Sequence, residues 1–298
     1  MRHLSGDASG NVQTSVRHRF RVWAEYLKIE HTLFSVPLIY AGALLAEPPL
    51  TPSTAALILV AATGARTTAL GLNRILDRHL DAQNPRTANR ALPAGAISLR
   101  GAVVVAILAF IVALAAAWAI SPRCLVIAPI PLAAFVGYPL LKRTTRWAHL
   151  GLGVTLALGP LCGFYAVALE WRGLFPIVML STFTALWSAG FDILYATLDE
   201  ESDRKTGVFS LPAAIGSRRA VRIAAGMHAL AFAALMLLFS TSLHGAVSGL
   251  LFILTGGLFV LQHLLRQHVN FAFFQVNAAL GCVVFLGILL SQTSIPGS

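Results

Sequence analysis

Long apolar stretches place the strongest constraint on how this chain can fold. A helix that crosses a bilayer needs roughly 20 apolar residues, within a range of about 17–25. Nine stretches of about this length follow one another, separated by loops such as EPPLTP, KRTTR and TSLHG. The predicted spans lie near residues 29–46, 54–76, 101–120, 124–141, 148–169, 174–198, 220–240, 245–265 and 272–292. The pattern predicts an all-α membrane protein with a bundle of nine transmembrane helices.

The scarcity of charge supports the same fold class. Charged residues make up 11% of the chain, whereas a soluble domain has about 25%. Residues 1–22 are the exception, because they are polar and lack the apolar core of a signal peptide, so we expect a flexible cytoplasmic tail. Residues 23–298 are expected to form a single transmembrane domain.

The distribution of Lys and Arg predicts the orientation in the membrane. With the N-terminus in the cytoplasm, 19 of the 22 basic residues fall on the cytoplasmic side, Arg123 and Arg172 fall outside, and Arg66 lies within a span. We therefore expect a multi-pass protein of a bacterial inner or plasma membrane. The net charge of +10 is explained by loops beside an anionic leaflet or by an anionic ligand, and it does not indicate a nucleic-acid partner.

Two short stretches contain most of the acids. Seven of the 12 Asp and Glu residues lie in NRILDRHLDAQNPRTANRALPAG, residues 73–95, and in DILYATLDEESDRKTG, residues 192–207. The first stretch follows the second predicted span and the other follows the sixth, both at cytoplasmic ends. A site formed by these two acidic stretches would therefore face the cytoplasm.

The spacing within each stretch places its polar residues on one face of a helix. In the first stretch these residues are Asn73, Asp77 and Asp81. In the second stretch they are Asp192, Tyr195, Asp199 and Asp203. Oxygen ligands favour Mg²⁺, which is commonly completed by substrate phosphates, and the residue order of a calcium-binding EF-hand is absent. The two acidic faces therefore predict a magnesium site between them.

Basic residues accompany the acids. Arg78 and Arg90 lie in the first stretch, Lys205 lies in the second, and the loop after the fourth span adds Lys142 and Arg143. Acids and bases that face one compartment can hold a phosphate, through the metal and through direct contacts from Lys and Arg. We expect these five side chains to bind a diphosphate.

Arg66 lies apart from these bases, inside the second predicted span. It shares a helical face with Asn73 and Asp77. Two roles are open for it: an ion pair with an acid, or binding of an anionic group of the substrate. His31, near the start of the first span, is expected at the membrane interface or in a cavity wall.

Both acidic stretches resemble the motifs of the UbiA-type intramembrane prenyltransferases. The matching patterns are N-x3-D-x3-D followed by N-R-x-L-P-x-G, and D-x2-Y-A-x2-D-x3-D-x-K-x-G-x2-S, together with YPLLKRTT and LKIEHTLFSVPL. The resemblance implies a bundle around a central cavity that opens to lipid, and two Mg²⁺ ions that bridge the diphosphate of an isoprenyl donor. By position it implies metal ligands at Asn73, Asp77, Asp81, Asp199 and Asp203, and cavity residues at Asp192 and Tyr195.

The activity that this resemblance implies is Mg-dependent transfer of an isoprenyl group from a prenyl diphosphate to an aromatic acceptor. The acceptor would be of the 4-hydroxybenzoate or hydroxynaphthoate type used in quinone biosynthesis. Members that use 4-hydroxybenzoate often read R-L-D-K-P near the first span, whereas residues 27–31 read LKIEH, which looks closer to the naphthoate branch. The first motif also departs from the family at Arg74, where an acid is common.

Two other functions fit the same residues. A membrane terpene synthase would ionise the same donor and cyclise it without an acceptor. A cation-coupled transporter would also place acids in a membrane, although transporter sites tend to lie near the midplane in broken helices. An acceptor-dependent product favours the transferase, an acceptor-independent product favours the cyclase, and cation transport across vesicles favours the transporter.

Overall fold

The computed structural model describes residues 18, 20–28, 32–170, 173–243, 246–265 and 272–293. Every regular element in these residues is a helix. Most of the predicted tail lies outside the described residues, and so do His31 and Arg172.

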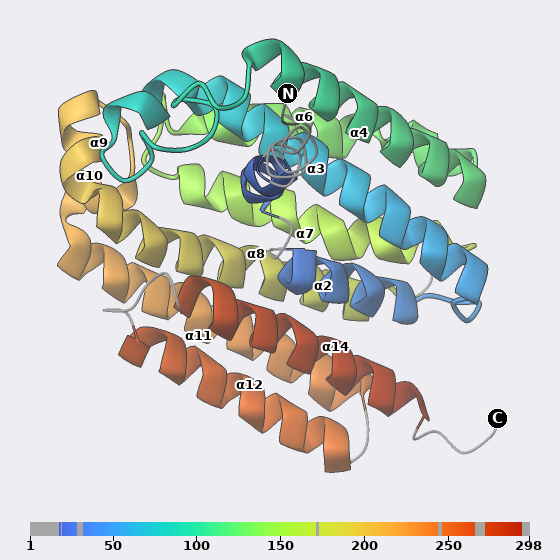
Figure 1. Ribbon diagram of the computed structural model, residues 1–298. Coiled ribbons are helices and arrows are strands. Elements are labelled where there is room, and N and C mark those ends of the chain that lie inside the picture. The colour runs from blue at the N-terminus through green and yellow to red at the C-terminus, as the bar shows by residue number, and fades with distance from the viewer. Residues whose placement is uncertain are drawn as a thin grey trace, which may run out of the picture.

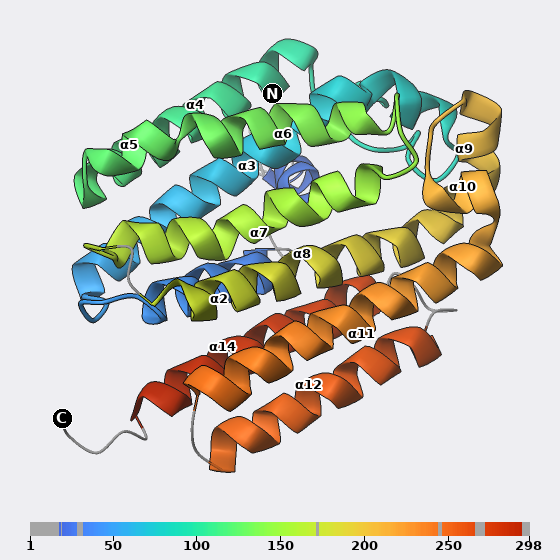
Figure 2. The ribbon, with the colours of Figure 1, turned by 180° about the vertical axis from the view of Figure 1, so that it is seen from behind.

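The long helices lie side by side in one bundle, with α4 at one side and α12 at the opposite side (Figures 1 and 2). The first half contains α2 (Thr32–Leu44), α3 (Pro52–Gln83), α4 (Leu99–Ile120), α5 (Arg123–Ile127), α6 (Pro129–Leu141), α7 (Ala148–Val167) and α8 (Leu174–Ala196). The second half contains α9 (Glu200–Thr206), α10 (Leu211–Ile215), α11 (Ser217–Ser242), α12 (Ala246–Leu264) and α14 (Asn277–Thr293).

Seven helical segments of the described chain are long and apolar enough to cross a membrane. The first and eighth predicted spans contain shorter apolar helices in the described residues, Ser35–Leu44 and Gly249–Leu264. The structure therefore supports a multi-pass helical membrane protein and bears out seven of the nine predicted spans.

The outer face of α4 shows why the bundle requires lipid around it. Val104, Ile107, Leu108 and Ile111 are each more than half exposed, at 53–56% of their full surface. An exposed apolar face of this size is unfavourable in water. It is compatible with lipid, because an α-helix satisfies its own backbone hydrogen bonds.

The core packs around α8, the most buried of the long helices. Trp187 and Phe183 of α8 are fully buried, and their rings stack with centroids 5.6 Å apart. They belong to one apolar cluster that also contains Leu235 of α11 and Leu280 of α14. This packing fixes the position of α8, at whose end the second acidic stretch begins.

Glycine allows α2 and α7 to pack closely. Gly163 of α7 lies directly against α2, because a Cβ at this position would overlap the backbone carbonyl of Ile39 on α2. We expect Gly163→Ala to lower the free energy of unfolding by about 1–3 kcal/mol, since α2 must shift to relieve the overlap. Thermal unfolding in detergent measures the effect. Gly137→Ala on α6 is the control, because a Cβ there meets nothing within 4 Å, and an equal loss in both variants would contradict the prediction.

Both acidic stretches end up at the same end of the bundle. The loop after α3, residues 84–98, lies beside α9 and α10 in both views (Figures 1 and 2). Hydrogen bonds join them, because Asn84 and Arg86 of this loop both contact Asp199. The fold therefore brings together two polar segments that are more than a hundred residues apart in sequence.

Candidate active site

A polar cavity of about 320 Å³ opens at this end of the bundle. Side chains from α3, α6, α7, α8 and α9 line it. All five predicted metal ligands and both residues predicted to line the reaction cavity are among the lining residues: Asn73, Asp77, Asp81, Asp192, Tyr195, Asp199 and Asp203. The structure thus brings the two acidic stretches to one cavity.

The first acidic stretch is part of α3, which continues beyond the predicted end of the span to Gln83. Asn73, Asp77 and Asp81 therefore share one helical face, as their spacing predicts. Asp77 is buried and forms an ion pair with Lys142 from the end of α6. Asp81 forms an ion pair of 2.9 Å with Arg90.

The second acidic stretch is not one continuous helix, which corrects the prediction of a single helical face. The α-helical hydrogen bonding of α8 ends at Ala196, a 3₁₀ turn covers Thr197–Asp199, and α9 begins at Glu200. The tighter turn changes the angular position of each following residue. Asp192 and Asp203 line the same cavity nevertheless.

Arg86 connects the loop after α3 to the second acidic stretch. Its Nε donates to Oδ1 of Asp199 at 2.8 Å, its Nη2 donates to Oδ2, and its Nη1 donates to the Tyr195 hydroxyl at 2.8 Å. The guanidinium also lies over the Tyr195 ring, 4.8 Å from its centroid. Burial opposes the charge, but the hydrogen bonds to Asp199 raise the pKa of Arg86 above its ordinary value. The guanidinium is therefore charged and holds both partners.

Asp192 has a different partner. Its Oδ2 lies 2.6 Å from Nδ1 of His149 on α7, and His149 Nε2 accepts a hydrogen bond of 3.2 Å from the backbone N–H of Leu211. The His149 side chain is 7% exposed and that of Asp192 is 28% exposed. The Asp192 side chain can therefore contact a molecule in the cavity, and the more deeply buried His149 holds Asp192 in place.

The donor atoms of the cavity suit a divalent cation, although the acids do not converge on one point. Asp77, Asp81 and Asp199 are each paired with a cation, and no group of three or more acid, His or Cys side chains among the described residues is close enough to hold an ion. Oδ1 of Asp77 is buried and has no hydrogen-bond partner. A buried carboxylate oxygen without a partner is costly, and a hard cation would satisfy it.

The predicted basic residues divide into two groups. Lys142 and Arg90 line the polar cavity. Three others lie outside its walls: Arg78 and Arg143 donate to the backbone carbonyls of Ile75 and Leu76, and Lys205 pairs with the exposed Glu201. These three side chains are therefore engaged outside the polar cavity.

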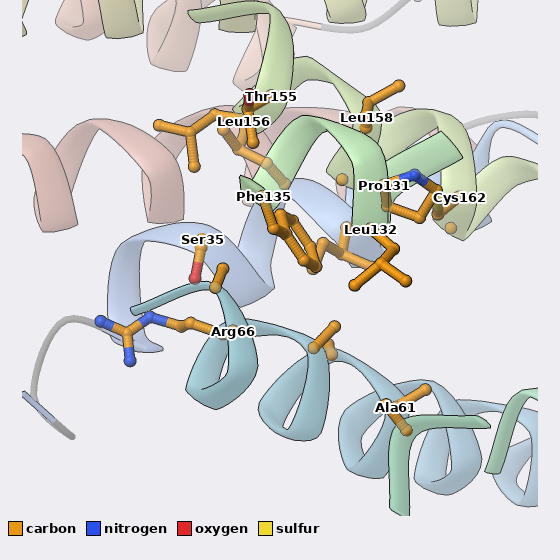
Figure 3. A pocket seen from close by; sticks show the side chains of 18 of the residues that line it. Ser35, Ala61, Arg66, Pro131, Leu132, Phe135, Thr155, Leu156, Leu158 and Cys162 are labelled. Carbon is orange, nitrogen blue, oxygen red and sulfur yellow. The ribbon is translucent and has the colours of Figure 1, made fainter. Parts of the chain in front are cut away.

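A second cavity, of about 400 Å³, adjoins the first and is apolar. Side chains of α3, α6 and α7 surround it, among them Phe135 and Leu156 (Figure 3). Leu70, Tyr138 and Leu152 line both cavities, so the two are adjacent at these side chains.

Arg66 belongs to this apolar cavity and not to the polar one. Its guanidinium lies at the edge of the cavity, on the side of Ser35 (Figure 3). It donates to the backbone carbonyls of Leu27 and Lys28 at 3.5 and 3.2 Å. Arg66 therefore places a positive charge beside an otherwise apolar space.

Four residues of the polar cavity were not selected from the sequence: Asn84, Arg86, Tyr138 and His149. Tyr138 accepts a hydrogen bond of 2.9 Å from Asn73. Arg86 and Asn84 lie in the same acidic stretch as the metal candidates, so their position was a usable signal. His149 offers a weaker signal, an ionisable side chain near the start of an apolar span.

Comparisons with known proteins agree with this architecture. The profile of the UbiA prenyltransferase family matches residues 35–290. A 4-hydroxybenzoate octaprenyltransferase of Photobacterium profundum is 31% identical over 228 residues, 74% of this chain and 77% of that protein. A polyprenyl transferase of Arthrobotrys oligospora is 35% identical over 198 residues, 61% of this chain, and the match spans about half of that longer protein, 53%.

Solved structures share the fold. A UbiA homolog from Aeropyrum pernix K1, solved in its apo form, superposes with a TM-score of 0.82 and 32% identity, over 89% of this chain and 98% of that chain. A UbiA homolog from Archaeoglobus fulgidus, bound to GPP and Mg²⁺, superposes with a TM-score of 0.67 over 91% of this chain and 98% of that chain. Because this second structure is 17% identical to the chain, the similarity shows a common fold.

Proposed function

The chain belongs to the UbiA prenyltransferase family, and we propose that it transfers an isoprenyl group from a prenyl diphosphate to a hydroxylated aromatic acid inside the membrane. The adjacency of the two cavities carries this proposal. A prenyl diphosphate has a charged head and an apolar tail, and here a polar cavity with acids and bases lies next to an apolar cavity, with Leu70, Tyr138 and Leu152 in the lining of both.

The diphosphate would lie in the polar cavity. Asn73, Asp77, Asp81, Asp199 and Asp203 would hold two Mg²⁺ ions, which when bound neutralise charge on the leaving diphosphate. The oxygen-rich donor set and the unpartnered Oδ1 of Asp77 support this assignment.

Lys142, Arg90 and Arg86 would bind the diphosphate directly. Each of them pairs with one of the proposed metal ligands and offsets its negative charge. We propose that these three cations turn from the carboxylates to the diphosphate oxygens when the donor binds. Arg78, Arg143 and Lys205 lie farther out and would act only through the general positive potential at the cavity mouth.

The aromatic acid would bind between Arg66 and the polar cavity. Arg66 precedes Asn73 by seven residues on α3, a rise of about 10 Å along the helix axis. Its guanidinium would bind the carboxylate of the acceptor, and the ring would then reach the junction of the two cavities. The naming of a related protein as a 4-hydroxybenzoate octaprenyltransferase supports an acceptor of this class.

The side chains around the junction support ionisation of the donor followed by attack of the ring. The allylic C–O bond breaks and its electron pair goes to the diphosphate. An aromatic carbon of the acceptor forms the new C–C bond, and the proton on that carbon passes to the Asp192 carboxylate. The face of Tyr195, which already contacts the guanidinium of Arg86, would stabilise the allylic cation. The surrounding apolar side chains would exclude water from this cation.

We also propose that the polar cavity faces the cytoplasm. The excess of Lys and Arg at this end of the bundle supports that orientation.

A panel of substrates tests the proposed function. Membranes that contain the protein are incubated with Mg²⁺, prenyl diphosphates of several lengths, and 4-hydroxybenzoate or a hydroxynaphthoate, and the products are read by mass spectrometry. We expect a prenylated aromatic acid that disappears when EDTA removes the metal. A cyclised hydrocarbon that forms equally without the acid would instead identify a terpene synthase, and cation flux into vesicles without any product would identify a transporter.

A further inference from the structure

His149 lies between the second acidic stretch and the start of α10, and neither sequence motif contains it. Its Nδ1 is 2.6 Å from Oδ2 of Asp192, and its Nε2 is 3.2 Å from the backbone nitrogen of Leu211. His149 is buried, at 6% of its full surface, and is one of the residues that line the polar cavity. One imidazole thus joins α7, α8 and α10.

These two hydrogen bonds fix the tautomer of His149. A backbone N–H can only donate, so Nε2 must be the acceptor in the bond with Leu211. In a neutral imidazole with an acceptor Nε2, the proton is on Nδ1, which therefore donates to Asp192. His149 cannot take a proton from the substrate through Nε2 without breaking the bond to Leu211.

We propose that His149 is the positioning residue of Asp192: its Nδ1–H holds the Oδ2 oxygen so that the Oδ1 oxygen faces the acceptor ring. This inference rests on the proposed function, in which Asp192 takes the ring proton. Among the described residues, His149 is the one hydrogen-bond partner of Asp192, and Oδ1 accepts no hydrogen bond. The arrangement leaves one carboxylate oxygen held and the other available to a ligand.

The surroundings explain why such a residue is needed. Asp77, Asp199 and Asp203 line the same cavity and would share cations. A carboxylate without a fixed partner could turn toward those cations and leave the acceptor ring. A hydrogen bond from a buried imidazole is strong at a site of low dielectric constant, and it keeps the carboxylate where the ring proton leaves.

Two substitutions separate this role from a purely structural one. In His149→Asn the amide nitrogen occupies the position of Nδ1, so it can donate to Asp192, but the bond to Leu211 is lost. In His149→Gln the amide oxygen occupies the position of Nε2, so it can accept from Leu211, but the donor to Asp192 is lost. Both side chains are uncharged, like the neutral imidazole.

Both variants are purified in detergent, checked by melting temperature, and assayed with the acceptor that the wild type prenylates, with and without deuterium on its ring. We expect His149→Gln to lower kcat by about 10- to 100-fold. Its KM for the prenyl diphosphate should stay within a few-fold, and a deuterium isotope effect on kcat should appear because proton loss has become slow. His149→Asn should keep kcat within a few-fold of the wild type, without an isotope effect.

The opposite order of the two variants would overturn the proposal. If His149→Asn lost activity while His149→Gln kept it, the bond to Leu211 would be the important one and the role of His149 would be to hold α10. Wild-type kinetics in both variants would show that Asp192 needs no positioning residue. A wild-type protein that prenylates none of the aromatic acids would instead contradict the proposed function itself.

Discussion

Asp77→Asn should lower prenyl transfer by about 1000-fold while the protein still folds and inserts in the membrane. The substitution keeps the shape of the side chain but removes the negative charge that a divalent cation requires. Asp77 is the most buried of the acids around the cavity, and its Oδ1 has no partner within the described residues, so other side chains cannot easily replace it. Activity in membranes with saturating donor, acceptor and Mg²⁺ measures the loss.

Binding provides a second measurement for this variant. Mg²⁺ with inorganic pyrophosphate should raise the melting temperature of the wild type and should not raise that of Asp77→Asn, because ligands stabilise only the protein that binds them. Glu201→Gln is the matched control, since Glu201 lies in the second acidic stretch but is exposed and pairs with Lys205. Transfer within a few-fold of the wild type in Asp77→Asn would show that Asp77 is not a metal ligand.

Asp192→Asn should also abolish most of the activity, by about 100- to 10,000-fold, but for a different reason. The amide oxygen can still accept the hydrogen bond from His149, so the local structure is retained. The amide cannot take a proton from the acceptor ring at neutral pH, so the step that completes the transfer is lost.

The binding measurement separates the two acids. Asp192→Asn should keep the increase in melting temperature with Mg²⁺ and pyrophosphate, because Asp192 pairs with His149 and not with a diphosphate-binding cation. A variant that loses this increase as completely as Asp77→Asn would place Asp192 among the metal ligands. A variant that still transfers the prenyl group at near wild-type rates would show that another group accepts the proton.

Several features of the site were readable from the sequence because they depend on local spacing. The interval of four residues between Asn73, Asp77 and Asp81 places them on one face of any regular helix, and α3 is regular over this stretch. The same argument places Asp192 and Asp203 together, and both line the polar cavity. It does not predict the local structure between them. A 3₁₀ turn of three residues at Thr197–Asp199 interrupts the helix, and the spacing of polar residues does not reveal such a turn.

Of the five basic residues predicted to bind a diphosphate, Arg90 and Lys142 line the polar cavity. Arg78, Arg143 and Lys205 are as close to the acids in sequence as Lys142 and Arg90 are, but they lie outside the cavity wall. Arg86 donates hydrogen bonds to Asp199 and Tyr195. Nothing in the sequence distinguishes it from the other Arg and Lys residues of the loops. Any Lys or Arg in a cytoplasmic loop satisfies the charge rule for membrane proteins, so this rule cannot select the ones that contact a ligand.

By itself, the sequence determined the class of the protein, the approximate position of most of its helices and the two acidic stretches that form the site. Apolar length and helical spacing are properties of contiguous residues, so they need no knowledge of distant partners. The tertiary structure alone decided the pairs: Lys142 with Asp77, 65 residues apart, Arg86 with Asp199, 113 apart, and His149 with Asp192, 43 apart. It also decided that a polar and an apolar cavity meet at shared side chains. Such contacts depend on how separate helices pack against one another, and the packing of α8 in the core sets where its acids lie.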